Sequence, residues 1–230
     1  GKIYAADIPL HTGPNCLAEA LSYVTLVPNT ARQKWCNYAR QTYLASFEID
    51  AQDSPVDMGA VMQILADTLP DDVIVTHGAG NFALWPNRFM KYGSEARLLG
   101  PQSGAMGAGV PAAIAAKARY PERTVLCFAG DGDFQMNGNE LGTAMQEHIQ
   151  PIILILNNGT YGTIRMHQER TYPNRVSGTD LVNPDFVTLA SAYGFHGERV
   201  ERTYEFSAAF DRALASSTGA VIELMIGAEA

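Results

Sequence analysis

Short apolar runs recur along the chain from residue 73 onward, and several are followed directly by Gly or Asn. The two clearest are Thr124–Ala129 and Pro151–Leu156, which contain no charged residue. Continuous apolar runs of this length are typical of parallel strands that are buried on both faces. We predict six strands, at residues 73–76, 96–99, 124–129, 152–156, 197–201 and 220–226.

The segments between these runs carry apolar residues at helical spacing. The first predicted helix starts at Ser54-Pro55-Val56-Asp57, with Pro in the first turn and an acid at the positive end. Further helices are predicted at residues 139–148, 183–193 and 204–217. Strands that alternate with helices indicate an α/β fold, here an open, mostly parallel six-stranded sheet flanked by helices.

Residues 1–50 do not follow this alternation. Their pattern predicts a short strand, a helix near residues 15–24 and a longer helix at about 30–47, and residues 48–54 read as a polar linker. We therefore expect two parts, a small α/β segment at residues 1–50 and a larger domain at residues 54–227.

Polar residues follow two of the predicted strands. Gly130-Asp131-Gly132 closes the strand at 124–129, and Asn157-Asn158 closes the strand at 152–156. The helix between them, which Asn137 or Asn139 could cap, makes a β-α-β unit. Because such crossovers are right-handed, the two strands are neighbours or near neighbours, so Asp131 and Asn158 should emerge at the same carboxyl edge.

This pair of side chains suits a magnesium ion. Magnesium requires octahedral oxygen ligation and is usually held by one or two protein side chains together with phosphate oxygens. Asp131 and Asn158 supply two ligands, and the backbone carbonyl of Thr160 could supply a third. The glycines flanking Asp131 would let phosphate approach the backbone closely. Read singly, each motif could be an ordinary turn.

Together these motifs resemble the signature of thiamine diphosphate-dependent enzymes, in which the Asp and the second Asn ligate magnesium. Residues 101–114 resemble the segment of acetolactate synthase-type enzymes that holds the bent cofactor. The resemblance implies that Met106 wedges between the cofactor rings and that the backbones of Gly104 and Met106 bond the pyrimidine. Residues 77–82 resemble the diphosphate loop of the family. The cofactor-binding positions that the resemblance implies are Ala79, Gly80, Asn81, Phe82, Gly104, Met106, Gly130, Gly132, Asp133, Asn158, Tyr161 and Gly162.

Other functional classes fit less well. The loop at residues 77–82 starts like a dinucleotide fingerprint, but Ala83 and Leu84 stand where its third glycine belongs. A net charge of −8 without a run of Lys or Arg argues against binding of nucleic acid. The sequence has neither an apolar stretch of transmembrane length nor a leader at its start, so we expect a cytoplasmic protein. Cys16, Cys36 and Cys127 suggest neither a disulfide framework nor a zinc site.

The resemblance implies that one catalytic group is missing. In this superfamily a glutamate from a separate pyrimidine-binding domain, usually of the partner subunit, activates the cofactor. We expect no catalytic residue in this chain, residues 1–50 as the tail of a middle domain, and the glutamate in missing N-terminal domains or a partner chain. The intact enzyme is expected to be a homodimer or homotetramer.

The substrate side is less specific. Residues 158–170 differ from true acetolactate synthases and resemble benzoylformate decarboxylase. Arg165 could bind a substrate carboxylate, or it could pair with Glu169 one helical turn away. His77 and His167 lie near the expected site and stay open as proton carriers. The resemblance implies a small 2-oxo acid substrate and either a carboligase or a simple decarboxylase. A split-enzyme subunit and a non-catalytic thiamine diphosphate-binding module remain alternatives.

Overall fold

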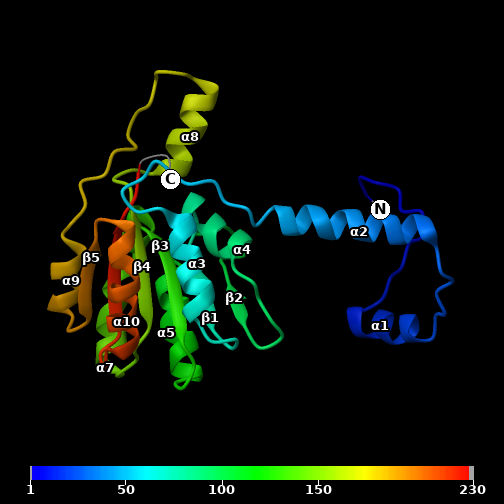
Figure 1. The fold of residues 1–230 in the computed structure, drawn as a ribbon, viewed down its shortest axis with the longest axis horizontal. Helices are drawn as coiled ribbons and strands as arrows, with labels where there is room; N and C mark the ends of the chain where they lie inside the picture. The colour runs from blue at the N-terminus through cyan, green and yellow to red at the C-terminus, as the bar shows by residue number, and fades with distance from the viewer. Residues whose placement is uncertain (1, 228–230) are drawn as a thin grey trace. The chain divides into compact units, whose positions relative to one another are not determined.

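The computed structural model of the chain describes residues 2–227. The chain divides into two compact units, Gly1–Glu48 and Ile49–Ala230. The first unit contains α1 (Pro14–Ser22) and α2 (Thr30–Ala45), as predicted (Figure 1). The predicted short strand is wrong, because the described residues before α1 form none.

The second unit is built on six strands, all parallel. They are β1 (Ile74–His77), β2 (Arg97–Leu99), β3 (Val125–Gly130), β4 (Ile152–Asn157), β5 (His196–Val200) and β6 (Ala220–Met225). Their order across the sheet is β2-β1-β3-β4-β6-β5. The prediction of a six-stranded parallel sheet is therefore confirmed, and β3 and β4 are direct neighbours.

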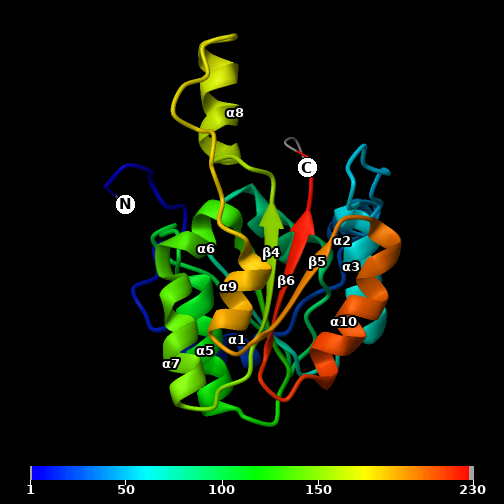
Figure 2. The ribbon, with the colours of Figure 1, turned by 90° about the vertical axis from the view of Figure 1, so that its left-hand side faces the viewer.

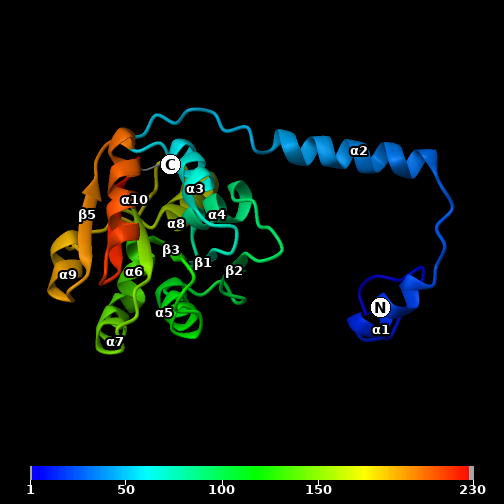
Figure 3. The ribbon, with the colours of Figure 1, turned by 60° about the horizontal axis from the view of Figure 1, so that its bottom comes forward.

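Helices cover both faces of this sheet (Figures 2 and 3). One face carries α3 (Met58–Thr68), α4 (Leu84–Phe89) and α10 (Phe206–Ala215), and the other carries α5 (Gly109–Arg119), α7 (Leu141–Gln146) and α9 (Phe186–Ala192). Two hydrophobic clusters result, one on each side of the strands. Since every residue of β3 and β4 is buried, both of these strands lack the alternation of a half-exposed strand.

The connection between β3 and β4 differs from its prediction. The chain turns directly into α6 (Asp131–Asn137), followed by the 3₁₀ turn η2 (Gly138–Glu140) and α7. The helical segment thus starts at Asp131, where an acidic residue favours the positive end of a helix, rather than at Asn139. The predicted capping by Asn137 or Asn139 is also wrong, and the Asn137 side chain donates instead to the Gly107 carbonyl.

Three strands end at the edge of the sheet that positions the site. β1 leads into the 3₁₀ turn η1 (Asn81–Ala83), β3 into α6, and β4 into α8 (Gly162–Thr171). Figure 2 shows α8 extending beyond the carboxyl end of β4. The remaining 3₁₀ turn, η3 (Thr203–Glu205), precedes α10. Among residues 2–227, we find no helix with the length and apolar character that crossing a membrane requires.

Candidate functional site

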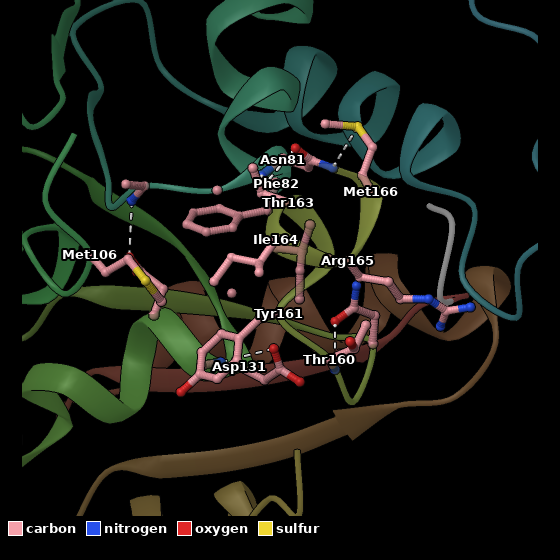
Figure 4. Close-up of a pocket in the computed structure, with 18 of the residues that line it drawn as sticks. Asn81, Phe82, Met106, Asp131, Thr160, Tyr161, Thr163, Ile164, Arg165 and Met166 are labelled. Carbon is pink, nitrogen blue, oxygen red and sulfur yellow. Dashed lines mark hydrogen bonds between the residues drawn. The ribbon is translucent and has the colours of Figure 1, made fainter. Parts of the chain in front are cut away.

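A cavity of about 290 Å³ opens where β1, β3 and β4 end (Figure 4). Of the site residues predicted from the sequence, all but Gly104 line it. Those lining it are Ala79, Gly80, Asn81, Phe82, Met106, Gly130, Asp131, Gly132, Asp133, Asn158, Thr160, Tyr161, Gly162 and Arg165. Gly104 lies in the loop before α5 with φ +67°, outside the lining. The cavity therefore brings together predicted residues from four separate stretches of sequence, three of which follow the ends of β1, β3 and β4.

Asp131 is a buried carboxylate at the end of β3, with 3% of its surface exposed. Its Oδ1 accepts the N–H of Gly132 at 2.9 Å, and its Oδ2 accepts the N–H of Gly159 at 2.9 Å and Nδ2 of Asn183 at 2.7 Å. Burial raises the pKa of Asp131, while these hydrogen bonds act in the opposite direction. A bound cation would further favour the ionised carboxylate.

The turn after β4 places two further oxygens beside this carboxylate. Gly159 adopts φ +67°, a conformation that glycine reaches without strain. The turn is closed by the N–H of Thr160, which donates to Asn158 Oδ1 at 3.2 Å, and by the N–H of Gly162, which donates to the Thr160 carbonyl at 2.9 Å. Each oxygen keeps a second lone pair with which it could ligate a metal.

The oxygen set fits magnesium. It comprises a carboxylate, an amide oxygen and a backbone carbonyl, which are the hard ligands that this ion prefers. No cluster of three His, Cys, Asp or Glu side chains suited to a metal occurs among the described residues. Phosphate oxygens of a bound cofactor would therefore have to complete the coordination of the magnesium ion, as is usual for magnesium sites with few protein ligands.

The glycines around Asp131 leave no space for a side chain. A Cβ on Gly132 would lie 2.4 Å from the Tyr161 ring, and one on Gly130 would lie 2.9 Å from the Phe82 ring. The backbone thus approaches the cavity closely at both positions, as a diphosphate site requires.

Asp133 connects two loops of the cavity wall. Its Oδ1 accepts the N–H of Ala79 at 3.0 Å and the N–H of Gly107 at 2.9 Å. Its Oδ2 is buried and has no hydrogen-bond partner. Burial raises the pKa of Asp133, against the effect of the two N–H donors. This carboxylate holds the loop before η1 and the Met106 loop together.

The loop at residues 79–82 is also tied to α8. The N–H of Asn81 donates to Thr163 Oγ1 at 3.0 Å, and this hydroxyl donates back to Asn81 Oδ1 at 2.8 Å. The N–H groups of Ala79 and Asn81, which the resemblance assigned to phosphate, therefore have protein partners in this structure. In Figure 4 the Met106 side chain lies on the left of the cavity, and those of Arg165 and Met166 lie on its right.

Arg165 and Glu169 form an ion pair along α8, with Nε and Oε1 3.0 Å apart. Both residues line the cavity. The pair is half exposed to solvent, so its contribution to stability is small. The structure therefore contains the predicted alternative in which Arg165 pairs with Glu169. This ion pair uses Nε of the Arg165 guanidinium.

His77 is held in one tautomer. Its Nδ1 lies 2.6 Å from the Gly78 carbonyl, which can only accept, so Nδ1 carries the proton. Its Nε2 lies 3.0 Å from Asn87 Nδ2, which donates. Both ring nitrogens of His77 thus serve the fold. His167 is exposed, and its Nδ1 lies 3.0 Å from Arg170.

The sequence analysis missed several residues of the cavity wall. They are Leu156, Thr163, Ile164, Met166, Glu169 and Ile226. The helical spacing that follows Gly162 could have identified those that belong to α8, namely Thr163, Ile164, Met166 and Glu169. The sequence analysis also gave no role to Asn157 or Asn183, which hydrogen-bond each other at 2.9 Å directly behind Asp131. The signal for Asn157 was its place at the end of a buried strand.

Comparison with known proteins identifies the family. Residues 78–224 match the family described as thiamine pyrophosphate enzyme, C-terminal TPP binding domain, and the chain belongs to that family. The family recognition made from the motifs is confirmed.

Several acetolactate synthases are among the similar curated proteins. The chain is 32% identical to acetolactate synthase isozyme 2 large subunit of Escherichia coli (strain K12), over 94% of this chain and 39% of that protein. It is 30% identical to acetolactate synthase of Mycobacterium leprae (strain TN), over 100% of this chain and 39% of that protein. The chain thus spans well under half the length of these relatives.

Proposed function

We propose that this chain is the cofactor-binding C-terminal part of a thiamine diphosphate-dependent enzyme that decarboxylates or ligates 2-oxo acids, similar to acetolactate synthase. One observation carries the proposal. The adjacent ends of β3 and β4 bring Asp131, Asn158 and the Thr160 carbonyl to a cavity that Met106 also lines. The family membership and the named relatives support the same assignment.

The residues of the cavity divide the work of binding. Asp131, Asn158 and the Thr160 carbonyl hold Mg²⁺, and the backbone around Gly130 and Gly132 receives the diphosphate. Tyr161, Gly162 and the loop at residues 79–82 complete the wall around it. Met106 supports the bent cofactor, with Gly104 in the same loop. Asp133 acts by fixing the loops that surround the diphosphate, since its Oδ1 already accepts two backbone N–H groups.

Bound thiamine diphosphate supplies carbanion stabilisation, which none of the twenty side chains provides. The protein residues bind it, orient it and exclude water. The carboxylate that activates the cofactor comes, in this proposal, from a pyrimidine-binding domain of a partner subunit. The chain alone is then inactive, and the intact enzyme is a homodimer or homotetramer.

Arg165 is the proposed contact for the substrate carboxylate. Its Nε is paired with Glu169, whereas its two Nη groups form no hydrogen bond or ion pair to another residue in the described part of the chain. The apolar side chains of Ile164 and Met166 flank it in the cavity wall. This composition suits a small 2-oxo acid with a short apolar substituent.

The first test measures cofactor binding rather than turnover. Isothermal titration of the purified chain with thiamine diphosphate, in the presence of Mg²⁺, should show binding that Asp131→Ala abolishes. Asp67→Ala is the matched control, because Asp67 is an exposed residue on α3 that bonds only Gln63 among the contacts found here. Equal binding by wild type and Asp131→Ala would contradict the proposal.

A second measurement addresses catalysis. Decarboxylation of a small 2-oxo acid should be absent with the chain alone and should appear once a polypeptide carrying the pyrimidine-binding domain is added. Cofactor binding without turnover in that mixture would instead favour a non-catalytic thiamine diphosphate-binding module.

A further inference from the structure

A line of polar side chains runs behind the proposed metal site. Arg199 on β5 donates from Nε to Glu223 Oε2 at 2.7 Å, and Asn157 Nδ2 donates to Glu223 Oε1 at 2.7 Å. Asn183 Nδ2 then donates to Asn157 Oδ1 at 2.9 Å and to Asp131 Oδ2 at 2.7 Å. The line therefore connects a carboxylate inside the sheet with the carboxylate in the cavity.

Glu223 is an unusual residue for its place. It lies in β6 with 1% of its surface exposed, among apolar neighbours of the strand. A buried carboxylate is costly unless it is paired and hydrogen-bonded. Arg199 supplies the pairing charge, and Asn157, which is 8% exposed, supplies the second hydrogen bond. The proposed binding of cofactor uses neither Glu223 nor Arg199 directly.

The Glu223 carboxylate determines the donor–acceptor direction of the hydrogen bonds between it and Asp131. An ionised carboxylate can only accept, so Asn157 must turn Nδ2 toward Glu223 and Oδ1 toward the cavity. There Oδ1 accepts the N–H of Gly159 at 3.1 Å and Nδ2 of Asn183. If the Asn157 amide were reversed, its Nδ2 would face these two donors.

Asn183 is fixed in the same way from the other side. Its Oδ1 accepts Nε2 of Gln135 at 2.9 Å, which leaves Nδ2 to face Asp131 and Asn157. Asp131 Oδ2 is thus held by a donor that Gln135 and Asn157 orient together, and Asn157 is itself oriented by Glu223.

We infer that Glu223 is a positioning residue for the proposed divalent cation. Through Asn157 and Asn183 it holds Oδ2 of the Asp131 carboxylate in hydrogen bonds, so that the lone pair left on Oδ1 is available to the cation. Outer partners of metal ligands typically change metal affinity about 10–100-fold when they are altered. The inference rests on the proposed function, because it assumes that Asp131 binds the cation.

Exchange of the amide and the carboxylate tests this directly. Glu223→Gln leaves the carboxamide with one acceptor for two donors, Arg199 and Asn157. Asn157→Asp places two carboxylates against each other. The double variant Asn157→Asp with Glu223→Gln restores a complete donor–acceptor scheme, since the new amide accepts from Arg199 and donates to the new carboxylate.

The measured quantity is the dissociation constant of Mn²⁺, followed by electron paramagnetic resonance in the presence of thiamine diphosphate. We expect Glu223→Gln and Asn157→Asp each to raise it about 10-fold or more, and the double variant to recover most of that loss. Ile222→Val, on the opposite face of the same strand, reports the effect of lost stability alone. Unchanged affinity in Glu223→Gln, or a double variant as weak as the weaker single variant, would overturn the inference.

A variant at a partly exposed position provides a second test if the substitutions inside the sheet impair folding. Asn183→Ala removes the hydrogen bond to Asp131 and changes a residue in a partly exposed loop. The matched control is Val182→Ala, because the adjacent Val182 is 99% exposed. Weaker Mn²⁺ binding in Asn183→Ala alone supports the inference, and equal binding in both contradicts it. If Asp131→Ala itself still binds Mn²⁺, the proposed function fails first.

Discussion

Two buried carboxylates two positions apart, Asp131 and Asp133, have different surroundings although both lie in the first turn of α6. Asp131 accepts three hydrogen bonds spread over both of its oxygens. Asp133 accepts two on Oδ1, and its Oδ2 has no partner. Asp131 therefore keeps one lone pair, on Oδ1, for a ligand at the strand end, whereas Asp133 joins two backbone segments through a single oxygen.

The unpartnered oxygen of Asp133 leads to a pH-dependent prediction. Burial raises the pKa of Asp133 from its ordinary value of 3.8, so above that pH the folded chain binds more protons than the unfolded chain. The free energy of unfolding contributed by this group therefore falls as pH rises through the window above 3.8. Asp133→Asn removes the buried charge and keeps an oxygen for the N–H groups of Ala79 and Gly107.

We expect Asp133→Asn, without cofactor, to melt above wild type at pH 7, with the difference shrinking as pH falls toward 3.8. Thermal unfolding followed by circular dichroism across this range measures it. Asp133→Ala is the contrasting variant, because it leaves the N–H groups of Ala79 and Gly107 unpaired, and the buried one, that of Gly107, costs about 1–3 kcal/mol. An Asp133→Asn variant that melts below wild type at neutral pH would contradict the assignment.

Gly132 gives a steric prediction at the same scale. A Cβ at this position would meet the Tyr161 ring at 2.4 Å and Leu181 at 3.1 Å. We expect Gly132→Ala to displace the ring into the cavity, to cost about 1–3 kcal/mol of stability and to weaken thiamine diphosphate binding.

Gly93→Ala is the control for this change, because a Cβ on Gly93 would have no atom within 4 Å. Calorimetric titration of both variants separates the steric effect from the loss of glycine itself. Cofactor affinity that falls equally in the two variants would count against the role given to Gly132.

At the scale of elements, the sequence predicted those parts of the site that depend on one strand and its own turn. Asp131 and Asn158 each follow an apolar run, and the handedness of the β-α-β unit places both at one edge. Glu223 could not be assigned in this way. Its partners come from β5 and β4, on either side of β6, and the order of strands across a sheet is not written in any local pattern.

At the start of α6, the local sequence pattern placed the helix boundary wrongly. The pattern predicted that the helix between β3 and β4 begins at Asn139, well after Gly130-Asp131-Gly132. In the structure the helical turns begin at Asp131, since tight packing against Tyr161 selects glycine at position 132. Tertiary contact thus overrides local propensity at the point where the site is formed.

Helix α3 offers a prediction about an element boundary. Asp57 is its N-cap, and its Oδ1 accepts the N–H of Gly59 at 2.8 Å. Replacement of an N-cap aspartate by alanine typically costs about 1 kcal/mol, so Asp57→Ala should lower the free energy of unfolding by about that amount. Asp57→Asn retains the acceptor and should stay close to wild type. Urea denaturation measures both, and similar losses in the two variants would show that charge, not capping, matters here.

At the scale of the whole molecule, the two units differ in what holds them together. Both hydrophobic clusters belong to the second unit and extend from Val56 to Ile226. In the described part of the first unit, residues 2–48, neither α1 nor α2 buries a residue. Trp35, Tyr38 and Val27 are examples of its large exposed side chains. Apolar surface that stays in contact with water contributes nothing to the hydrophobic stabilisation of folding.

Removal of residues 1–48 should therefore leave the second unit folded. Ile49, which packs against one cluster, is retained in the shortened chain. We expect one cooperative thermal transition within about 2–4 °C of the full chain, which corresponds to a change of no more than about 1 kcal/mol for a domain of this size. Differential scanning calorimetry measures the transition, and titration with Mg²⁺ and thiamine diphosphate shows whether the cavity is intact. A much lower or broadened transition would contradict this prediction. Retained stability with lost cofactor binding would instead place a binding residue in the first unit.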